Sequence, residues 1–209
     1  MTSLRERQKA QRRALIEKAA GELFEKKGFA DATIEEIAEM AVVSAPTVYN
    51  YYGSKGDLLL ALVAHGEEGI ESALSDFRQQ ATFHHPVEMV TKVILSNVND
   101  TLSALSRELW GHVIAFVATA PDPEVAPKYL ETIASGLAAA IEAVLHYYQE
   151  QNQVAENLDV HQLAYLLTRM ERIHFLNFVY LKAMTVADLE AAIAADVTLI
   201  VGPYVRKAA

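Results

Sequence analysis

The sequence predicts an all-α protein. Glycine and proline, which interrupt helices, number only 9 and 6 among 209 residues, whereas alanine and leucine, which favour helices, are abundant. Hydrophobic residues make up 52% of the chain and recur mostly at three- and four-residue intervals, the spacing of one helix face. We expect about nine helices, with an N-terminal domain of residues 1–55 followed by a helical bundle of residues 56–209.

The first two helices are predicted from their apolar spacing and their ends. The first runs from about residue 4 to 27 and ends at Gly28, a residue type that often terminates helices. The second, about residues 34–41, begins at Thr33. The Thr33 hydroxyl and the Glu36 carboxylate have the spacing of a capping box, in which each satisfies a backbone amide that the helix leaves unpaired.

The third helix is short and spans about residues 45–52. Ser44 is its expected N-cap, and Pro46 is compatible with the first turn, where its missing N–H costs no helical hydrogen bond. Helical spacing places Val48 and Tyr52 on the inward face. The opposite face carries small, hydroxyl, amide and aromatic side chains.

Two short helices joined by a brief turn, after a longer helix, form the outline of a helix-turn-helix. A three-helix hairpin with no role in DNA binding has the same outline. The spacing alone therefore leaves the function open.

The residues of this outline resemble a known family. The runs 33–38 and 43–59, together with the upstream pairs Ala19-Ala20 and Leu23-Phe24, closely resemble the N-terminal domain of the TetR family of transcriptional regulators. The resemblance covers about residues 15–60. It implies a homodimer that binds a palindromic double-stranded DNA operator and responds to a small-molecule effector held in its C-terminal helices.

The resemblance also implies which residues contact DNA. A ring or methyl group packs on a thymine methyl, and an amide or hydroxyl bonds a base edge, so Pro46, Thr47 and Asn50 are expected at bases. Phosphate contacts are expected from Tyr49, Tyr51 and Lys55, although either tyrosine could instead be a core residue. The full candidate set for DNA binding is Thr33, Ser44, Ala45, Pro46, Thr47, Tyr49, Asn50, Tyr51 and Lys55.

Two residues depart from the family pattern. Val42 stands where glycine is frequent, and a β-branched residue is strained if the turn requires a positive φ. Tyr52 stands where phenylalanine is more usual, which adds a hydroxyl that needs a hydrogen-bond partner or water.

Charge is divided unevenly along the chain. The net charge of −9 arises entirely after residue 60, because residues 1–60 hold nine Lys and Arg and nine Asp and Glu, and the remainder holds nine against eighteen. The segment before Leu15 is basic, which suits a DNA-binding arm. A solvated N-terminal helix without such a role would have the same composition.

Six further helices are expected after Gly53. The first begins with the capping-box-like run 54–57 and reaches about residue 80, and residues 81–86 form a connection. The others are predicted at about residues 87–105, 107–119, 125–151, 159–184 and 185–203.

The last two helices are apolar on more than one side. Residues 175–181 are hydrophobic nearly all round, which means that this helix needs partners on two sides. One interpretation is a central core helix. The other, implied by the family resemblance, is a dimer interface in which helices 159–184 and 185–203 form a four-helix bundle with their copies.

A ligand pocket is expected among the helices of the body, lined by apolar and aromatic side chains with a few polar groups. Each candidate taken singly is more often an ordinary core residue than a ligand contact. The candidates are Trp110, His112, Phe116, Tyr129, Ile133, Tyr147, Tyr165, Met170, His174 and Phe178. They indicate a hydrophobic or aromatic effector.

The sequence indicates no catalytic residues, no metal site and no cofactor. It contains no cysteine and no glycine-rich phosphate loop. The pairs Glu108/His112 and Glu171/His174 have helical spacing compatible with metal binding, but such pairs are more often ion pairs. We predict a cytoplasmic transcriptional repressor that is not an enzyme. The alternatives are a helical-bundle metal or cofactor enzyme, or a carrier of hydrophobic ligands, with a purely structural N-terminal domain.

Overall fold

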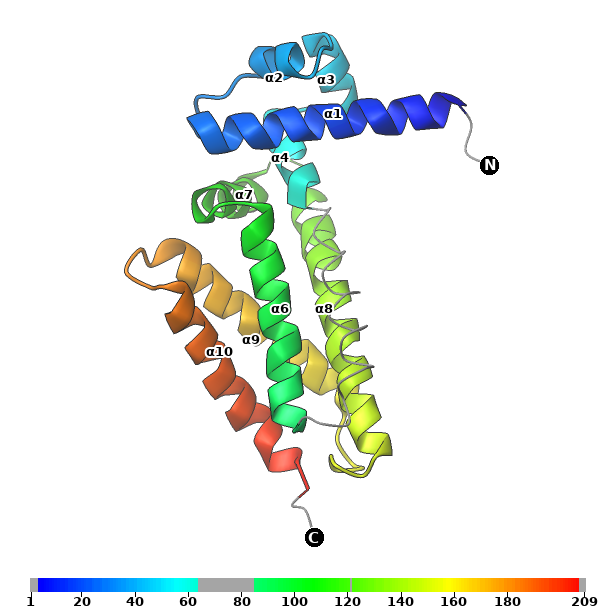
Figure 1. The fold of residues 1–209 in the computed structure, drawn as a ribbon, viewed down its shortest axis with the longest axis vertical. Helices are drawn as coiled ribbons and strands as arrows, with labels where there is room; N and C mark the ends of the chain where they lie inside the picture. The colour runs from blue at the N-terminus through cyan, green and yellow to red at the C-terminus, as the bar shows by residue number, and fades with distance from the viewer. Residues whose placement is uncertain (1–3, 64–84, 121, 207–209) are drawn as a thin grey trace. The chain divides into compact units, whose positions relative to one another are not determined.

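The computed structural model describes residues 4–63, 85–120 and 122–206, apart from the side chains of residues 128 and 131–135. These ranges are helical, and their only β-type pairing is an isolated bridge between Val154 and Val205. The helices are α1 Leu4–Lys27, α2 Ile34–Met40, α3 Ala45–Tyr52, α4 Lys55–Val63, α6 Pro86–Ala104, α7 Arg107–Thr119, α8 Val125–Glu150, α9 Val160–Tyr180 and α10 Val186–Val201, followed by a 3₁₀ turn, Gly202–Tyr204 (Figure 1). The all-α prediction is confirmed.

The chain divides into two compact units, which we describe separately. The first comprises residues 1–66 and 102–126, and the second comprises residues 67–101 and 127–209. The first unit therefore contains α7 as well as the helix-turn-helix, whereas the sequence placed a boundary at residue 55. The predicted continuation of α4 to residue 80 and most of the connection 81–86 lie outside the described residues.

The first unit is built around the apolar face of α1. α2 and α4 pack against α1, α3 packs against α2 and α4, and α7 packs against α4 (Figure 1). The core combines residues from all five helices. Its buried members include Ile16, Ala20, Phe24, Ile37, Val48, Leu58, Leu59 and Val113.

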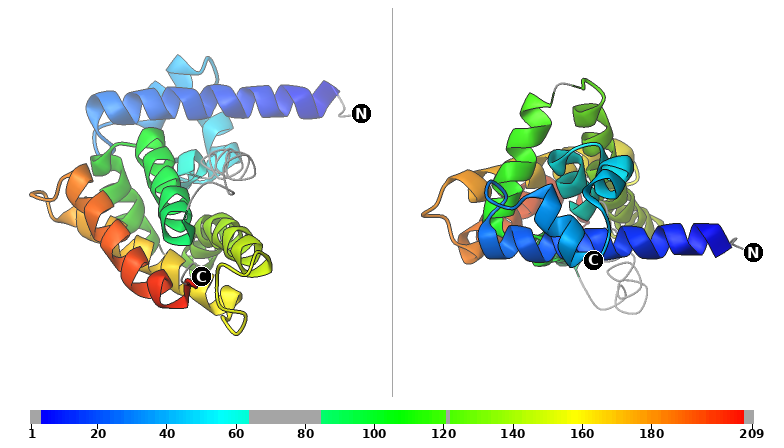
Figure 2. Two further views of the ribbon diagram at one scale, coloured as in Figure 1. Left: turned by 60° about the horizontal axis from the view of Figure 1, so that its bottom comes forward. Right: turned by 90° about the horizontal axis from the view of Figure 1, so that it is seen from above.

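The second unit contains most of α6 together with α8, α9 and α10. Figure 1 and Figure 2 show α10 alongside α9, in agreement with their contacts. Each helix contributes an apolar stripe to a common core. Buried members include Val90, Ile94, Leu137, Ile141, Leu145, Tyr148, Leu163, Leu167, Ile193 and Val197.

α9 ends earlier than predicted. Its helical conformation stops at Tyr180, and Leu181 leaves it with φ −88° and ψ 84° while its N–H still bonds the Asn177 carbonyl. The prediction of an end near Met184 was wrong because apolar spacing continues through a tight turn, in which the Met184 N–H bonds the Leu181 carbonyl at 2.7 Å. Apolar periodicity alone does not reveal this break.

Within the described part of the chain, no helix is both long and apolar enough to cross a bilayer.

Candidate nucleic-acid interface

The capping box predicted for α2 is present. The Glu36 N–H donates to the Thr33 hydroxyl oxygen and the Thr33 N–H donates to the Glu36 carboxylate, each over 3.2 Å. Lys27 donates to the same carboxylate at 2.5 Å, and this hydrogen bond, followed by that from the Thr33 backbone, lowers the pKa of Glu36. The end of α1 and the start of α2 are thereby tied together.

α3 begins at the predicted cap. The Ser44 hydroxyl oxygen accepts a hydrogen bond from the Thr47 N–H at 3.3 Å, and the two hydroxyl oxygens lie 2.8 Å apart. This arrangement fixes the side-chain rotamer of Thr47. Its hydroxyl retains capacity for one further hydrogen bond at the surface.

The exposed face of α3 has the composition expected of a surface that docks in a groove. Ser44, Pro46, Tyr49 and Asn50 are exposed, and Ala45, Thr47 and Tyr51 are half-buried. Val48 and Tyr52 are buried, as predicted. The exposure of Tyr49 argues against the interpretation of this residue as part of the core.

Tyr52 finds its hydroxyl partner on α1. The hydroxyl donates to the Glu17 Oε1 at 2.9 Å, and the Arg13 Nε lies 3.3 Å from the same oxygen. Burial, followed by the hydrogen bond to Glu17, raises the pKa of Tyr52. Glu17 is itself buried, so this polar cluster fixes the C-terminal end of α3 against α1.

The turn between α2 and α3 requires a positive φ at Val42, where φ is 56°. The Val43 N–H bonds the Ala38 carbonyl at 2.9 Å and the Val42 N–H bonds the Glu39 carbonyl at 3.1 Å, the two bonds of a Schellman motif. A β-branched residue is strained in this conformation. The strain foreseen for Val42 is therefore present, and its side chain is 89% exposed.

The Lys55 side chain does not extend into solvent, as a lysine that contacts a DNA phosphate would. Its ammonium donates to the carbonyls of Phe29, Ala30 and Ala32 at 2.6, 3.0 and 2.9 Å, and lies 4.7 Å from the centroid of the Phe29 ring. All three N–H donors of the ammonium serve the loop between α1 and α2. A phosphate contact by Lys55 stays a prediction, and it would require exchange of at least one of these bonds.

α7 packs directly against α4 in the first unit. A Cβ added to Gly56 would lie 2.2 Å from the Phe116 ring, which shows how closely α7 approaches the backbone of α4. The His112 ring lies 5.2 Å from the Phe29 ring, and the Ser106 N–H donates to the Glu25 carboxylate at 2.9 Å. Two of the predicted pocket residues, His112 and Phe116, thus pack α7 against other helices and loops of the first unit.

The remaining pocket candidates differ in their surroundings. Trp110 and Phe178 are buried, Tyr129, Tyr147 and Met170 are half-buried, and the side chain of Ile133 is not among those described. Tyr165 is exposed and lies under the Arg169 guanidinium, while His174 pairs with Asp196. Trp110, His112 and Phe116 belong to the first unit and the other seven to the second.

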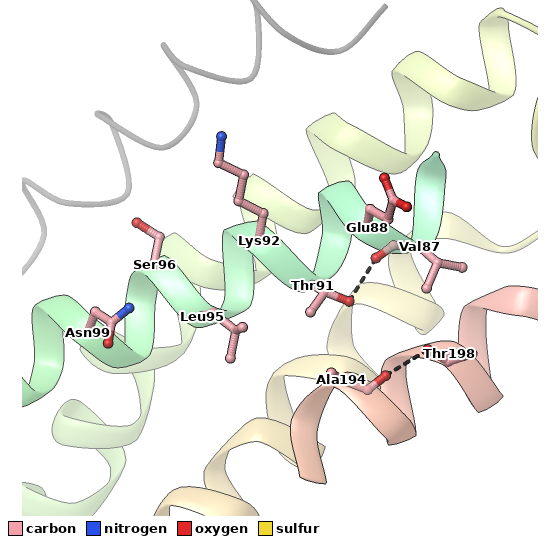
Figure 3. Close-up of a pocket in the computed structure, with 9 residues that line it drawn as sticks. All are labelled: Val87, Glu88, Thr91, Lys92, Leu95, Ser96, Asn99, Ala194 and Thr198. Atoms are coloured by element: carbon pink, nitrogen blue, oxygen red, sulfur yellow. Dashed lines mark hydrogen bonds between the residues drawn. The ribbon is translucent and has the colours of Figure 1, made fainter. Parts of the chain in front are cut away.

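A groove of about 630 Å³ lies between α6 and α10 in the second unit (Figure 3). None of the predicted pocket residues lines it. Its lining residues are Val87, Glu88, Thr91, Lys92, Leu95, Ser96, Asn99, Ala194 and Thr198.

Metal binding receives no support from the described residues, among which no three His, Asp or Glu side chains gather as a ligand set. The Glu171/His174 pair separates into a buried carboxyl and a histidine that faces Asp196.

The sequence had not identified Glu17, Phe29 or Gly56 as important. The Tyr52 hydroxyl indicated that a hydrogen-bond partner was needed, but the sequence did not show that Glu17 is this partner.

Comparison with known proteins shows a similarity of the N-terminal helices to bacterial regulators. Residues 16–62 match the family model described as bacterial regulatory proteins, tetR family. The chain is 33% identical over 84 residues to the HTH-type transcriptional regulator HbdR of Aromatoleum sp. (strain CIB). The matched segment covers 40% of this chain and 36% of the length of that curated relative. The chain therefore spans about a third of that relative.

Solved structures extend the similarity over nearly the whole chain. Thermus thermophilus FadR, a TetR family transcriptional repressor crystallised with lauroyl-CoA, is 26% identical, with a TM-score of 0.71 over 94% of this chain and 97% of that one. A regulator from Mesorhizobium loti is 18% identical, with a TM-score of 0.71 over 94% and 98%. Bacillus subtilis FadR with stearoyl-CoA is 19% identical, with a TM-score of 0.58 over 90% and 97%; these last two similarities support the fold alone.

Proposed function

Because the chain belongs to the TetR family of bacterial transcriptional regulators, we propose that it is a homodimeric repressor whose DNA binding is released by a hydrophobic effector. The observation that carries the proposal is the exposed face of α3. It is capped by Ser44, held from beneath by Val48 and Tyr52, and presents Pro46 and Asn50 outward. This face lies within the part of the chain that matches the family.

Sequence recognition is assigned to Pro46, Thr47 and Asn50. The Asn50 amide can donate to and accept from a base edge, and the Pro46 ring can pack on a thymine methyl. Tyr49 and Tyr51 flank this set on α3 and are placed at phosphates, with the N-terminus of α2 at Thr33. The basic residues of α1 before Leu15 add salt-sensitive affinity.

Dimerisation is assigned to α9 and α10. One side of α9 is buried in its own bundle, as expected of a core helix. The opposite side exposes large apolar side chains, and this is the side that we assign to the dimer interface. Exposed apolar groups of this size are typical of interfaces. Those on or near α9 and α10 are Tyr165, Leu166, Ile173, Tyr180, Leu181, Val186 and Leu199.

Release from DNA is assigned to a shift between two shapes of the dimer. A dimer that binds a palindrome must hold its two recognition helices about 34–36 Å apart, one turn of DNA. An effector that binds better to another shape reduces the population that meets this requirement. Within the first unit, the contact of Phe116 with Gly56 provides a rigid connection from α7 to α4.

A hydrophobic effector is supported by one similar structure. Thermus thermophilus FadR was crystallised with lauroyl-CoA. We carry over to this chain only the class of ligand, a molecule with a long apolar chain.

The proposal is tested by selecting bound sites from a random pool of double-stranded DNA with the full-length protein. We expect a palindromic site with two half-sites about one helical turn apart, and an affinity that falls steeply with salt. A selected site with one unpaired half-site would contradict the dimer. Failure to enrich any sequence, with stoichiometric metal in the purified protein, would favour the alternative of an enzyme.

A further inference from the structure

One side of the groove between α6 and α10 is apolar. On α6 it consists of Val87, Thr91 and Leu95, which are spaced one helical turn apart and lie on the side toward α10 (Figure 3). Ala194 and Thr198 of α10 form the facing wall. Each threonine hydroxyl already donates to the carbonyl four residues earlier in its own helix, at 2.8 Å on α6 and 2.7 Å on α10. Hydrocarbon groups therefore dominate this side of the groove.

The other side of the groove is polar. Figure 3 shows Lys92 and Ser96 on the part of α6 that lies farther from α10. The polar row consists of Glu88, Lys92, Ser96 and Asn99, which follow one another at three- and four-residue intervals. From residue 87 to residue 99 the helix rises by about 18 Å. The groove is therefore elongated, and its two long sides differ in polarity.

The polar row combines different kinds of hydrogen-bonding group. The Glu88 carboxylate only accepts and the Lys92 ammonium only donates, whereas Ser96 and Asn99 do both. A carboxylate lying on this row would be repelled by Glu88, and an ammonium group would be repelled by Lys92. A hydroxyl group both donates and accepts, so it can bond at every position of the row. The row therefore favours a neutral molecule with several hydroxyl groups.

An acceptor without a partner lies beside the end of this row. The Asp100 Oδ2 is buried and has no hydrogen-bond partner among the described residues, and burial raises the pKa of this carboxyl group. Asp100 does not itself line the groove, but it directly follows Asn99 and lies one helical turn after Ser96. Since buried polar atoms are nearly always hydrogen-bonded, this oxygen requires a partner that the described residues do not supply.

We propose that the groove binds an elongated hydrocarbon molecule whose hydroxyl groups all lie on one face. The hydrocarbon face packs on the apolar side next to α10. The hydroxyl groups bond to the polar row, and the last of them reaches Asp100. The groove volume of about 630 Å³ is within the usual range of small-molecule sites. This site rests on the proposed function, in which a hydrophobic effector releases the protein from DNA, and it specifies where that effector binds and what chemistry it carries.

The test is equilibrium dialysis of the full-length protein against methyl cholate, a neutral steroid ester whose hydroxyl groups all lie on one face. Methyl cholanate, which has the same skeleton without hydroxyl groups, is the matched probe. In the double variant Ser96→Ala, Asn99→Ala, methyl cholate should bind at least about tenfold more weakly, because two hydrogen bonds are lost. Binding of methyl cholanate should be unchanged.

Asp100→Leu separates a ligand contact from a structural role. This variant should weaken methyl cholate binding by about threefold or more and leave methyl cholanate binding unchanged. In the free protein, the midpoint of thermal unfolding should stay the same or rise, because the substitution removes a buried oxygen without a partner. A lower midpoint together with unchanged methyl cholate binding would exclude Asp100 from the site.

The apolar side is tested by filling the groove. Ala194→Phe should abolish the binding of both probes, whereas Ala143→Phe, at an exposed alanine of α8, is the matched control and should bind both as the unmodified protein does. The double variant Ser96→Ala, Asn99→Ala only removes atoms, so it decides the question even where Ala194→Phe does not fold.

Equal binding of methyl cholate to the unmodified protein and to the double variant would overturn the site. Full binding to a folded Ala194→Phe variant, or no binding of methyl cholate at all, would overturn it too. Release of a selected operator by lauroyl-CoA, without any binding of methyl cholate, would overturn this site while leaving the regulator intact. The expected pattern of binding in a protein that selects no DNA site would instead support the site and contradict the proposed function.

Discussion

The hydroxyl of Tyr52 on α3 donates a 2.9 Å hydrogen bond to the Oε1 of Glu17 on α1, between residues 35 positions apart in the chain. Arg13 approaches the same carboxylate oxygen at 3.3 Å, and its guanidinium lies 5.7 Å from the centroid of the Tyr52 ring. A buried carboxylate and a buried hydroxyl thus satisfy each other where α3 packs against α1.

Removing this hydroxyl should destabilise the first unit. Tyr52→Phe leaves the buried Glu17 carboxylate with one donor fewer, at a cost of about 1–3 kcal/mol in the free energy of unfolding measured with urea. The double variant Tyr52→Phe, Glu17→Gln should recover part of the loss. Additive costs in the double variant would show that the two side chains are not energetically coupled.

Glycine at the turn before α3 should be stabilising. Val42 has φ 56°, so Val42→Gly relieves strain of about 1–2 kcal/mol, partly offset by the greater freedom of glycine in the unfolded chain. We expect a higher midpoint of thermal unfolding. Val43→Gly is the control, since the structure shows no positive φ there, and it should lower the midpoint.

Gly56 should not tolerate a methyl group. In Gly56→Ala the new Cβ would lie 2.2 Å from the Phe116 ring, which forces α4 and α7 apart and costs about 1–3 kcal/mol. Gly21→Ala is the matched control, because among the described residues its Cβ would meet only Leu62, at an ordinary 3.9 Å. It should be neutral or stabilising, by up to about 1 kcal/mol.

The smaller side chain in Phe116→Leu should restore part of the stability lost in Gly56→Ala. Chemical unfolding of the single and double variants measures this coupling. Costs that simply add would contradict a direct steric contact between residues 56 and 116.

Charge on the exposed face of α9 should separate the subunits. Ile173 is 59% exposed, and Ile173→Glu would place a carboxylate in the proposed apolar interface. Light scattering coupled to size-exclusion chromatography should report a monomer. Leu130→Glu, at a similarly exposed apolar residue on α8, should leave the dimer intact.

Asn50 should determine which base is preferred at one operator position, and not the affinity for DNA in general. Asn50→Ala is expected to relax sequence preference at one position of each half-site, with a loss of about 1–3 kcal/mol on the selected operator. Asn157→Ala, at an exposed residue after α8, serves as the control in the same competition assay. Uniform weakening on all sequences would place Asn50 at a phosphate instead.

Lys55 illustrates how the structure refines a predicted role. The sequence placed it near DNA by resemblance, whereas its ammonium bonds three backbone carbonyls between α1 and α2. That geometry depends on how the loop at Phe29 folds back, which residues near Lys55 do not encode. The place of Lys55 after the third helix could be predicted from the sequence. The hydrogen-bond partners of its ammonium could not.

Local interactions made most of the helices predictable. The caps at Thr33 and Ser44 each join a residue to one three positions later, and both predictions are confirmed. Strain at Val42 was predicted only on the condition that the turn has a positive φ there, and the structure meets that condition with a φ of 56°. For the caps the sequence by itself was sufficient.

Tertiary structure decided the contacts that join distant parts of the chain. Glu17 meets Tyr52, Phe116 meets Gly56, and packing buries Glu171 while His174 turns to Asp196. Helical spacing states which residues share a face, but not what lies opposite that face. The sequence alone thus predicted most of the helices, their caps and the family resemblance, whereas the three-dimensional packing determined the partners of the polar groups that the helices bury.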